Sequence, residues 1–502
     1  MNLEGLDEAR KAIARGEPAL VWRKFVADTI TPVGAAVQLI EEGRGDFLLE
    51  SVEGGEVRGR YSLLGLDPDL VFRATGNAAE INARWREDRN DFRATPENSL
   101  AALRNLLAQC RIDVPETLPP ALACVVGYFG YETIGLVEQL PRAPRQALDL
   151  PDMLFCRPTL LLIFDGLTDE CFCIAPIWSS PADPDEAFGT ARNRIENVLA
   201  QLTAGRPIRR APANVESDPQ PVPQIATEDY LAMVESAKEY IAAGDIFQVV
   251  LSQRFTAPFE LPPLELYRAL RRINPSPFLY FLDLPGFAVV GSSPEILVRV
   301  RDGEVTIRPI AGTRPRGATV AEDEAAEVSL LADAKERAEH LMLLDLGRND
   351  VGRVASRGSV EVTDSFAVER YSHVMHIVSN VVGKLDERYD AIDAMFAGFP
   401  AGTVSGAPKI RACEIIAELE RDTRGPYAGG VGYFAPDGSL DSCIVLRTAV
   451  VKEGMMHVQA GAGIVADSDP SYELKECEAK AGALFAAARE AVRIAREASY
   501  GQ

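Results

Sequence analysis

Positive charge is scarce in this sequence, and no lysine- or arginine-rich run stands out. The 502 residues include 52 Lys and Arg against 74 Asp and Glu, which gives a formal net charge of −22. Such a chain repels phosphate backbones and anionic lipid headgroups, so we expect no nucleic-acid partner and no membrane. Anionic small substrates remain compatible with it, because they respond to the local field of a site.

Long apolar runs are also missing. No stretch is long enough to span a bilayer, and residues 1–8 lack the basic region and the apolar run of a signal peptide. We therefore expect a cytoplasmic protein. The hydrophobic share of 47% is typical of a globular enzyme.

Cysteine and histidine are too sparse for a disulfide framework or a zinc site. The eight cysteines are scattered, and Cys171 and Cys173 would share one apolar strand face, so we expect reduced core thiols. His373 and His376 lie three residues apart, without a third histidine nearby in the sequence. For these histidines, a hydrogen-bonded core position and a general acid/base role both stay open.

Nucleotide fingerprints are absent as well. The spacing of Gly402, Gly406 and Lys409 does not fit a Walker A motif, although a glycine-rich loop that leads into a helix suits a carboxylate or phosphate. Gly461 and Gly463 lack the third glycine of a Rossmann fingerprint. We expect neither ATP nor NAD.

Short strands at hairpin spacing alternate with helices over most of the chain. This pattern predicts an α+β fold with mixed or antiparallel sheets and helices packed on one side. A stretch with five prolines, 203–226, predicts a linker or long loop between an N-terminal domain, 1–202, and a second domain, 227–492. In the second domain we expect helices at 264–272, 320–346, 390–397 and 408–421, and strands at 278–283, 287–291, 295–300, 304–308, 429–434, 442–451 and 455–460.

The stretch from Gly461 to Lys480 reads as a glycine-rich strand end, a turn and a helix. Asp469 suits the N-cap, and Pro470 suits the first helical position. Glu473 and Glu476 then share one helix face beside an apolar stripe formed by Leu474, Cys477, Ala481 and Leu484. Two readings stay open, namely a site for a hard cation with an anionic ligand and a solvated face with a Glu476–Lys480 pair.

A second acidic side chain, Glu339, lies on a helical stripe with Met342 and Leu346 that should be buried. A buried carboxylate costs several kcal/mol unless a cation compensates it. Lys335, one turn earlier, and a bound Mg²⁺ are equal candidates for that cation.

Taken in chain order, these segments resemble the chorismate-utilising enzymes, and among them the anthranilate synthase large subunits. No single segment is decisive, but the ordered set is specific. The matching segments are Ser293-Pro294-Glu295, Pro309-Ile310-Ala311-Gly312-Thr313, Ala338-Glu339, Leu346-Gly347-Arg348-Asn349-Asp350, His376-Ile377-Val378-Ser379, the loop 402–409 and the stretch 461–480.

The resemblance implies a sandwich-like core of sheets with helices on the outside, and a role for each matching residue. Glu339 and Glu476 match Mg²⁺ ligands, and Glu473 would act through a water molecule. Glu295 matches the acid that protonates the departing C4 hydroxyl of chorismate, and His376 matches a residue that assists loss of pyruvate. The implied chorismate contacts are Gln248, Gly312, Thr313, Thr403, Tyr427, Arg447, Gly461, Ala462, Gly463 and Lys480.

Two positions distinguish reactions within that family. Isochorismate-forming members carry a water-activating lysine where this chain has Gln248, and aminodeoxychorismate synthases carry a lysine nucleophile where it has Ala311. The resemblance thus implies amination by free ammonia and elimination of pyruvate to give anthranilate, the first step of tryptophan biosynthesis. The alternative is an aminodeoxychorismate synthase component I that uses ammonia directly.

The resemblance also implies a partner and an inhibitor. No Gly-x-Cys-x-Gly nucleophile segment occurs in the sequence, so a separate glutamine amidotransferase subunit, component II, would supply the ammonia. Ser51, Pro277, Phe278 and Leu279 match a feedback site for L-tryptophan, although the family usually has Tyr-Met where this chain has Phe278-Leu279.

Overall fold

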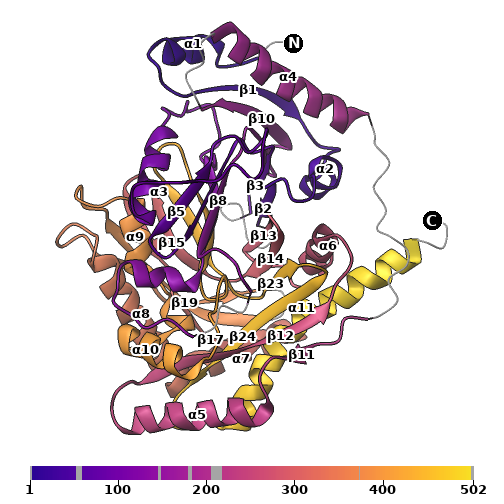
Figure 1. Cartoon of the computed structure of the whole chain (residues 1–502). Coiled ribbons are helices and arrows are strands. Elements are labelled where there is room, and N and C mark those ends of the chain that lie inside the picture. The colour runs from indigo at the N-terminus through magenta and orange to yellow at the C-terminus, as the bar shows by residue number, and fades with distance from the viewer. Residues whose placement is uncertain are drawn as a thin grey trace.

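A computed structural model of the chain describes residues 3–51, 59–144, 148–178, 184–204, 218–371 and 374–498. Within these residues the strands form two sheets of twelve strands each, and every strand pair is antiparallel. Helices cover the outer faces of the sheets (Figure 1). The predicted α+β fold with antiparallel sheets is confirmed.

The first sheet begins at one edge with the first strand of the chain and ends at the other edge with mid-chain strands from 222–258, which lie beside the last strand, 455–464. In Figure 1, β1 and β10 lie at the top, and β12 and β24 lie near the bottom. Its order is β1 (Ala19–Val26), β10 (Glu170–Ile177), β9 (Leu160–Asp165), β3 (Tyr61–Leu66), β2 (Phe47–Glu50), β13 (Phe278–Leu284), β14 (Phe287–Ser293), β23 (Thr448–Lys452), β24 (Met455–Ile464), β12 (Gln248–Pro258) and β11 (Val222–Pro223), with β20 (Gly406–Ala407) also paired to β12.

The second sheet likewise joins strands from distant parts of the sequence. Its order is β17 (Ile310–Pro315), β19 (Val374–Lys384), β16 (Glu304–Ile307), β15 (Ile296–Arg301), β22 (Leu440–Ile444), β21 (Gly430–Phe434), β7 (Val125–Phe129), β8 (Met153–Arg157), β4 (Leu70–Thr75), β5 (Ala78–Asn82) and β6 (Arg93–Ala94), with β18 (Glu361–Arg370) also paired to β19.

The helices have local sequence signals at their starts. Capping boxes begin α7 at Thr319 and α9 at Asp390, and Asp469 accepts a bond from the Tyr472 N–H at the start of α11, as predicted. The helices are α1 (Leu6–Ala14), α2 (Pro32–Leu39), α3 (Ser99–Gln109), α4 (Pro184–Thr203), α5 (Thr227–Ala242), α6 (Pro263–Ile273), α7 (Val320–Ala332), α8 (Ala334–Gly352), α9 (Ala391–Gly398), α10 (Lys409–Leu419) and α11 (Pro470–Ala498), with short 3₁₀ turns η1 (Tyr131–Leu136) and η2 (Gly402–Val404).

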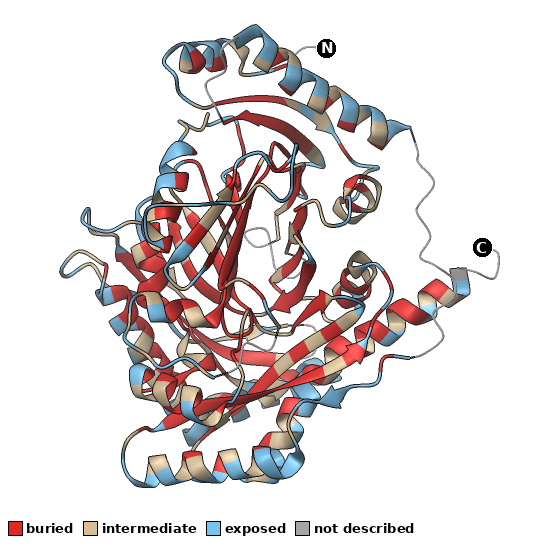
Figure 2. Cartoon of the chain, in the orientation of Figure 1, coloured by how far each residue is buried: buried red, intermediate tan, exposed pale blue. Residues whose placement is uncertain are grey.

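The core has three large layers. A central layer lies between the sheets and joins residues such as Leu161 and Val289 of the first sheet to Tyr128 and Val431 of the second. Two outer layers fill the space between each sheet and its helices. Figure 2 shows buried strands and outer helices exposed on one side, so the sandwich-like core is confirmed.

Two predicted elements are each divided in two. The helix expected over 320–346 breaks at Asp333, because that side chain accepts bonds from the N–H groups of Lys335 and Glu336 and so begins a new helix. The strand expected over 442–451 breaks at Arg447, whose φ of 47° lies outside strand geometry.

Both sheets combine strands from 1–202 with strands from 227–492, so these two segments share their hydrogen-bonded layers. The division into domains stays a prediction. Of the expected linker, residues 205–217 lie outside the described residues, whereas Val222 and Pro223 form β11 on the edge of the first sheet. All eight cysteines are buried and free, as predicted. Among the described helices, none has the length and apolar character needed to cross a membrane.

Candidate active site

The predicted acid Glu295 lies in the short connection between β14 and β15, and it is buried. Its Oε2 accepts a bond from Thr403 Oγ1 on η2 at 3.2 Å, and the Ile310 N–H also bonds to the carboxyl group. Burial nevertheless dominates and raises the pKa of Glu295 to about 8. The carboxyl therefore keeps its proton at neutral pH, which suits a general acid.

A small cavity adjoins Glu295. Its walls come from β15, from α8 and from the turn that carries Gly402 and Thr403. Asp350, which is buried, lines the same cavity. Its Oδ2 forms an ion pair with Lys409 Nζ at 2.8 Å. Lys409, the first residue of α10, is thus paired with Asp350.

His376 lies on β19, opposite Thr313 of β17, where the register shifts at Gly312. Its Nδ1 is 2.9 Å from the Gly312 carbonyl oxygen, which can only accept, so Nδ1 carries the proton and Nε2 is an acceptor. Burial lowers the pKa of His376, and the nearby charge of Arg447 lowers it further. The imidazole is thus neutral at pH 7. His373 lies outside the described residues.

The glycines of β24 allow two side chains to approach the backbone closely. A Cβ at Gly461 would lie 2.7 Å from the Tyr427 hydroxyl oxygen, and a Cβ at Gly463 would collide with the Gln248 side-chain nitrogen. Ala462 between them is fully buried. The three residues therefore form a bare strip of backbone that Tyr427 and Gln248 approach from one side.

Acidic side chains from two helices approach this strip. Glu339 of α8 accepts a hydrogen bond from Gln248, and burial raises its pKa, with the negative charges of Glu336 and Glu476 adding to the effect. Glu476 on α11 pairs with Lys480 Nζ at 2.7 Å, and the same Nζ donates to the Gly461 carbonyl at 2.9 Å. The predicted Glu476–Lys480 pair is confirmed.

Glu473 is buried one turn before Glu476, where burial raises its pKa and Ser468 bonds to its side chain. Among the described residues, no group of three or more His, Cys, Asp or Glu side chains forms a metal-binding cluster. Glu473 thus does not complete a protein-only site with the other two glutamates. The apolar stripe beside these acids behaves as expected, because Cys477, Ala481 and Leu484 are buried and Leu474 packs against the core.

The residues that match a feedback site lie where β2 and β13 pair. Leu279 pairs with Glu50, which directly precedes Ser51, while Phe278 pairs on its other side with Ser293 of β14. Pro277 directly precedes this strand. Glu50 is held by the Tyr267 hydroxyl at 2.6 Å and by Arg271 at 2.8 Å. The four predicted residues thus lie at or next to one strand junction. Ser293, the partner of Phe278, lies two residues before Glu295 in the sequence.

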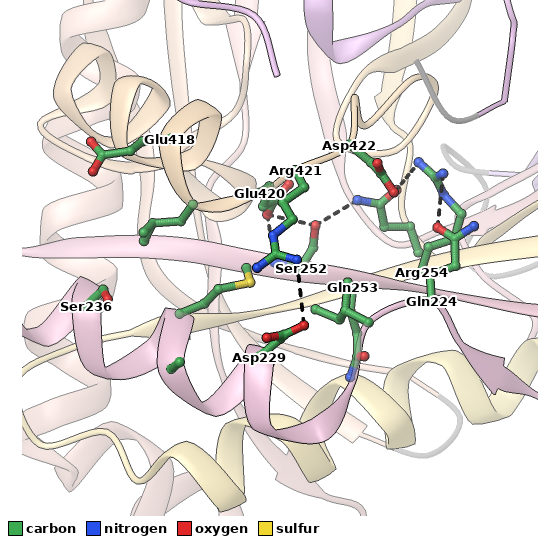
Figure 3. Close-up of a pocket in the computed structure, with 15 residues that line it drawn as sticks. Gln224, Asp229, Ser236, Ser252, Gln253, Arg254, Glu418, Glu420, Arg421 and Asp422 are labelled. Atoms are coloured by element: carbon green, nitrogen blue, oxygen red, sulfur yellow. Dashed lines mark hydrogen bonds and ion pairs between the residues drawn. The ribbon is translucent and has the colours of Figure 1, made fainter. Parts of the chain in front are cut away.

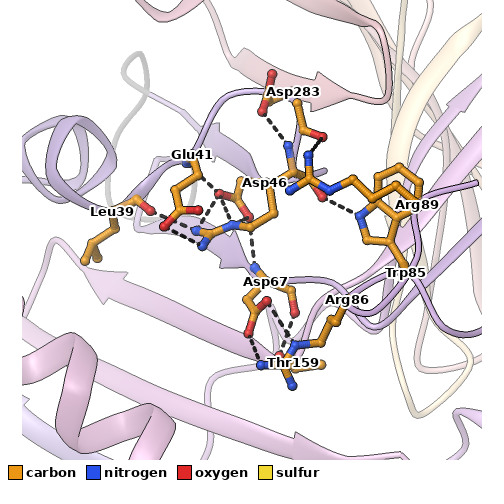
Figure 4. A network of polar contacts seen from close by, with 11 residues as sticks. Leu39, Glu41, Asp46, Asp67, Trp85, Arg86, Arg89, Thr159 and Asp283 are labelled. Atoms are coloured by element: carbon orange, nitrogen blue, oxygen red, sulfur yellow. Dashed lines mark hydrogen bonds and ion pairs between the residues drawn. The ribbon is translucent and has the colours of Figure 1, made fainter.

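A polar network joins the same two strands at their other end (Figure 4). The carboxylate of Asp46 accepts two bonds from Arg44 Nε and one from the Asp67 N–H, while the Asp46 carbonyl accepts from the Asp283 N–H. Asp283 accepts from the Arg44 N–H at 3.3 Å. Burial and the charge of Asp46 raise the pKa of Asp283 to about 7.

One polar residue near the site, Arg424, was not predicted from the sequence. It follows α10 in the stretch Glu420-Arg421-Asp422-Thr423-Arg424, which reads as an exposed polar loop, yet its side chain is only 1% exposed. The guanidinium carbon lies 5.6 Å from the centre of the Tyr427 ring. The spacing of Glu420 and Arg424 was the one available signal, and it does not reveal burial.

Comparison with known proteins now decides the family. The pattern of the chorismate binding enzyme family matches residues 46–486. The chain belongs to the chorismate-binding enzymes.

Within this family of chorismate-binding enzymes, the chain matches proteins named anthranilate synthase component 1 over its whole length. It is 52% identical to that of Cereibacter sphaeroides over 501 residues, which is all of both chains, and 46% identical to that of Pseudomonas putida over 94% of this chain and 95% of the relative. The crystal structure of anthranilate synthase component I from Streptococcus pneumoniae superposes with a TM-score of 0.76 at 33% identity, covering 92% of this chain and 99% of that one.

A second solved structure, at lower sequence identity, shows a similar fold. The menaquinone-specific isochorismate synthase of Escherichia coli superposes with a TM-score of 0.71 at 20% identity, over 97% of this chain and all of that one.

Proposed function

We propose that the chain is the large subunit of an anthranilate synthase, which converts chorismate and ammonia to anthranilate, pyruvate and water. The observation that supports this proposal is the position of helix α8. Its residues line the cavity beside the buried carboxyl of Glu295, which keeps its proton at neutral pH, and it also carries Glu339, whose pKa is raised by burial and by the charge of Glu476 on α11.

The protonated Glu295 suits the first stage. As the ammonia nitrogen bonds to C2 of the ring, the double bonds shift and the C4–O bond breaks, and Glu295 gives its proton so that the hydroxyl leaves as water. Such acid assistance is typically worth roughly 10² to 10⁴ in rate. We assign the neutral His376, whose Nε2 is an acceptor, to the later loss of pyruvate.

The acids on α8 and α11 fit a Mg²⁺ ion. Both offer hard carboxylate oxygens, and the charge of Glu476 raises the pKa of Glu339, a repulsion that a cation between them relieves. When bound there, Mg²⁺ neutralises the ring carboxylate of chorismate as a Lewis acid. Two protein carboxylates are enough for Mg²⁺, which keeps several waters, and Glu473 would act through one of them.

The remaining site residues bind and orient the substrate. The bare backbone from Gly461 to Gly463 can lie flat against the ring, and the Arg447 guanidinium suits a bidentate hold on a carboxylate. The other proposed contacts are Gln248, Gly312, Thr313, Thr403, Tyr427 and Lys480. Lys480 already binds Glu476 and the Gly461 carbonyl, so we assign it to the wall of the site.

The source of ammonia is a second chain. The relatives are named component 1, a name that implies a component 2 partner. We propose that this partner is a glutamine amidotransferase subunit and that the pair works in the cytoplasm. Ala311, buried on β17, offers no nucleophile of its own, which supports free ammonia as the reactant.

Feedback inhibition by L-tryptophan is proposed at the junction of β2 and β13. An amino acid there would contact Ser51, Pro277, Phe278 and Leu279. Because Phe278 pairs with Ser293 of β14, a ligand that displaces β13 also moves the segment that carries Glu295.

The deciding experiment is an assay of the purified chain with chorismate, Mg²⁺ and an ammonium salt, with the products identified by mass spectrometry. We expect anthranilate and pyruvate in equal amounts, and neither product after chelation of Mg²⁺. A stable amino-deoxy adduct without pyruvate would instead assign the chain to aminodeoxychorismate synthesis.

A further inference from the structure

Arg424 is a fully enclosed arginine that contacts several segments of the chain. Its Nη1 donates to the Val404 carbonyl at 2.8 Å, and its Nη2 donates to the Val250 carbonyl at 2.7 Å. Its Nε and Nη2 also bind both oxygens of Glu420, at 2.8 and 2.6 Å. The guanidinium carbon lies 4.7 Å from the centre of the Tyr131 ring and 5.6 Å from the centre of the Tyr427 ring. One planar group therefore contacts two backbone carbonyls, one carboxylate and two rings.

Three of the segments that Arg424 contacts carry a residue of the proposed chorismate site. Val404 follows Thr403, which bonds to the acid Glu295. Val250 lies on β12 two residues after Gln248, which bonds to Glu339.

The third segment carries Tyr427, whose hydroxyl faces Gly461. We propose that Arg424 is a positioning residue, which fixes the Thr403 turn, strand β12 and Tyr427 relative to one another. This inference rests on the proposed function.

Glu420, the carboxylate that binds Arg424, also contacts β12. Its Oε1 accepts from the Ser252 N–H at 2.8 Å and from the Ser252 hydroxyl at 2.9 Å, so it also anchors β12. Figure 3 shows Glu420 and Ser252 in the wall of a cavity of about 280 Å³, between α5, β12 and the end of α10. The Gln459 amide donates to the same Ser252 hydroxyl at 2.8 Å.

Energetics favour a positional role for this pair over a purely stabilising one. A buried ion pair contributes little net stability relative to apolar packing, because desolvation offsets the attraction between the charges. The arginine guanidinium is nevertheless a rigid planar group with five N–H donors, so it can donate to several fixed acceptors at once. A lysine keeps the charge but, with a single nitrogen, cannot hold Glu420, Val404 and Val250 in this geometry.

The test is Arg424→Lys, with Arg157→Lys as its matched control. Arg157 is also buried and binds a carboxylate with two nitrogens, but its partner is Asp69 and it packs near Trp178 in the N-terminal segment. Both variants should lose thermal stability. Only Arg424→Lys should raise the KM for chorismate, by about tenfold or more.

A pH profile supplies a readout that a purely structural role would not move. The Thr403 bond lowers the pKa of Glu295, so a displaced Thr403 turn should shift the alkaline limb of kcat/KM to higher pH. Equal KM values and equal pH profiles in the wild type, Arg424→Lys and Arg157→Lys would overturn the inference.

A second variant covers the case in which Arg424→Lys does not fold. Glu420→Gln keeps an oxygen for Ser252 but loses the charge that holds Arg424, so it should change KM and the pH profile in the same direction and by less. A folded Glu420→Gln with wild-type kinetics would overturn the inference. If wild type and Arg157→Lys both fold but make no anthranilate, the proposed function itself has failed.

Discussion

Buried carboxyl groups occur in two regions of this molecule, and their surroundings differ. In the polar network between β2 and β13, Asp46 is bound by the Arg44 guanidinium and by backbone N–H groups. At the proposed active site, Glu295 has only a threonine hydroxyl and one backbone N–H. Burial raises the pKa of both carboxyl groups, but at Asp46 the Arg44 guanidinium opposes that rise, whereas among the described residues no cation opposes it at Glu295, whose pKa reaches about 8.

The largest expected effect is the loss of turnover when one of the two proposed Mg²⁺ ligands, Glu339 or Glu476, is replaced. Glu339→Gln or Glu476→Gln should abolish turnover with ammonia at every Mg²⁺ concentration, because each removes a proposed ligand charge while keeping the side-chain shape. Circular dichroism and thermal melting should match the wild type. Undiminished activity in either variant would remove the metal assignment.

Glu295→Gln tests whether the proton on the Glu295 carboxyl group takes part in catalysis. We expect kcat to fall by roughly 10² to 10⁴, the range typical of general acid catalysis. Stability should be preserved, because an amide resembles the protonated carboxyl that the folded chain already buries. Steady-state kinetics with ammonium salt measure the loss, and a fall below about tenfold would contradict the acid role.

The pH dependence of kcat/KM in the wild type tests the protonation of Glu295 without a substitution. Because the proton must be present on Glu295, kcat/KM should be level below about pH 8 and then fall about tenfold per pH unit above it. Glu295→Gln should lack this limb. A limb at pH 4 to 5 in the wild type would show that the carboxyl is ordinarily ionised.

Ser51→Ala should weaken inhibition by L-tryptophan several-fold and leave kcat and KM unchanged. The expected size follows from the coupling between two sites, which is typically about 1–3 kcal/mol in total, of which one hydroxyl supplies a part. Inhibition curves with and without the substitution measure it, and identical curves would discard the proposed site.

The smallest effect on activity is expected in the polar network around Asp46 and Asp283, where a substitution should change only the free energy of unfolding. The pKa of Asp283 is raised to about 7 in the folded chain, so the folded state holds a proton that the unfolded state has lost, and this group destabilises the fold as pH rises from about 4 through 7. Asp283→Asn should remove that slope and stabilise the protein by roughly 2–4 kcal/mol at pH 8. Denaturant unfolding should show a larger gain at pH 8 than at pH 5.

Local signals in the sequence predicted much of the C-terminal part. The cap at Asp469, the shared face of Glu473 and Glu476 and the buried stripe beside them depend on residues within one helix, and they are confirmed. The pairing of β2 with β13 joins strands more than 200 residues apart, and no local period encodes it.

In the candidate site, too, some features follow from local sequence motifs and others depend on segments distant in the sequence. Its acids could be named from motifs, but the raised pKa of Glu295 arises from burial by segments distant in the sequence. Arg424 was missed for the reverse reason, because a run of polar residues usually marks solvent exposure. The division into domains stays a prediction, and strands from both proposed domains share each sheet.

The contact between Gly463 and Gln248 makes two positions in the sequence dependent on each other. A methyl group at 463 would occupy the space of the amide that reaches Glu339, so the flexible Gln248 side chain would have to shift to admit it. As long as position 248 is a glutamine, the absence of a side chain at 463 is therefore what lets its amide stay in reach of Glu339.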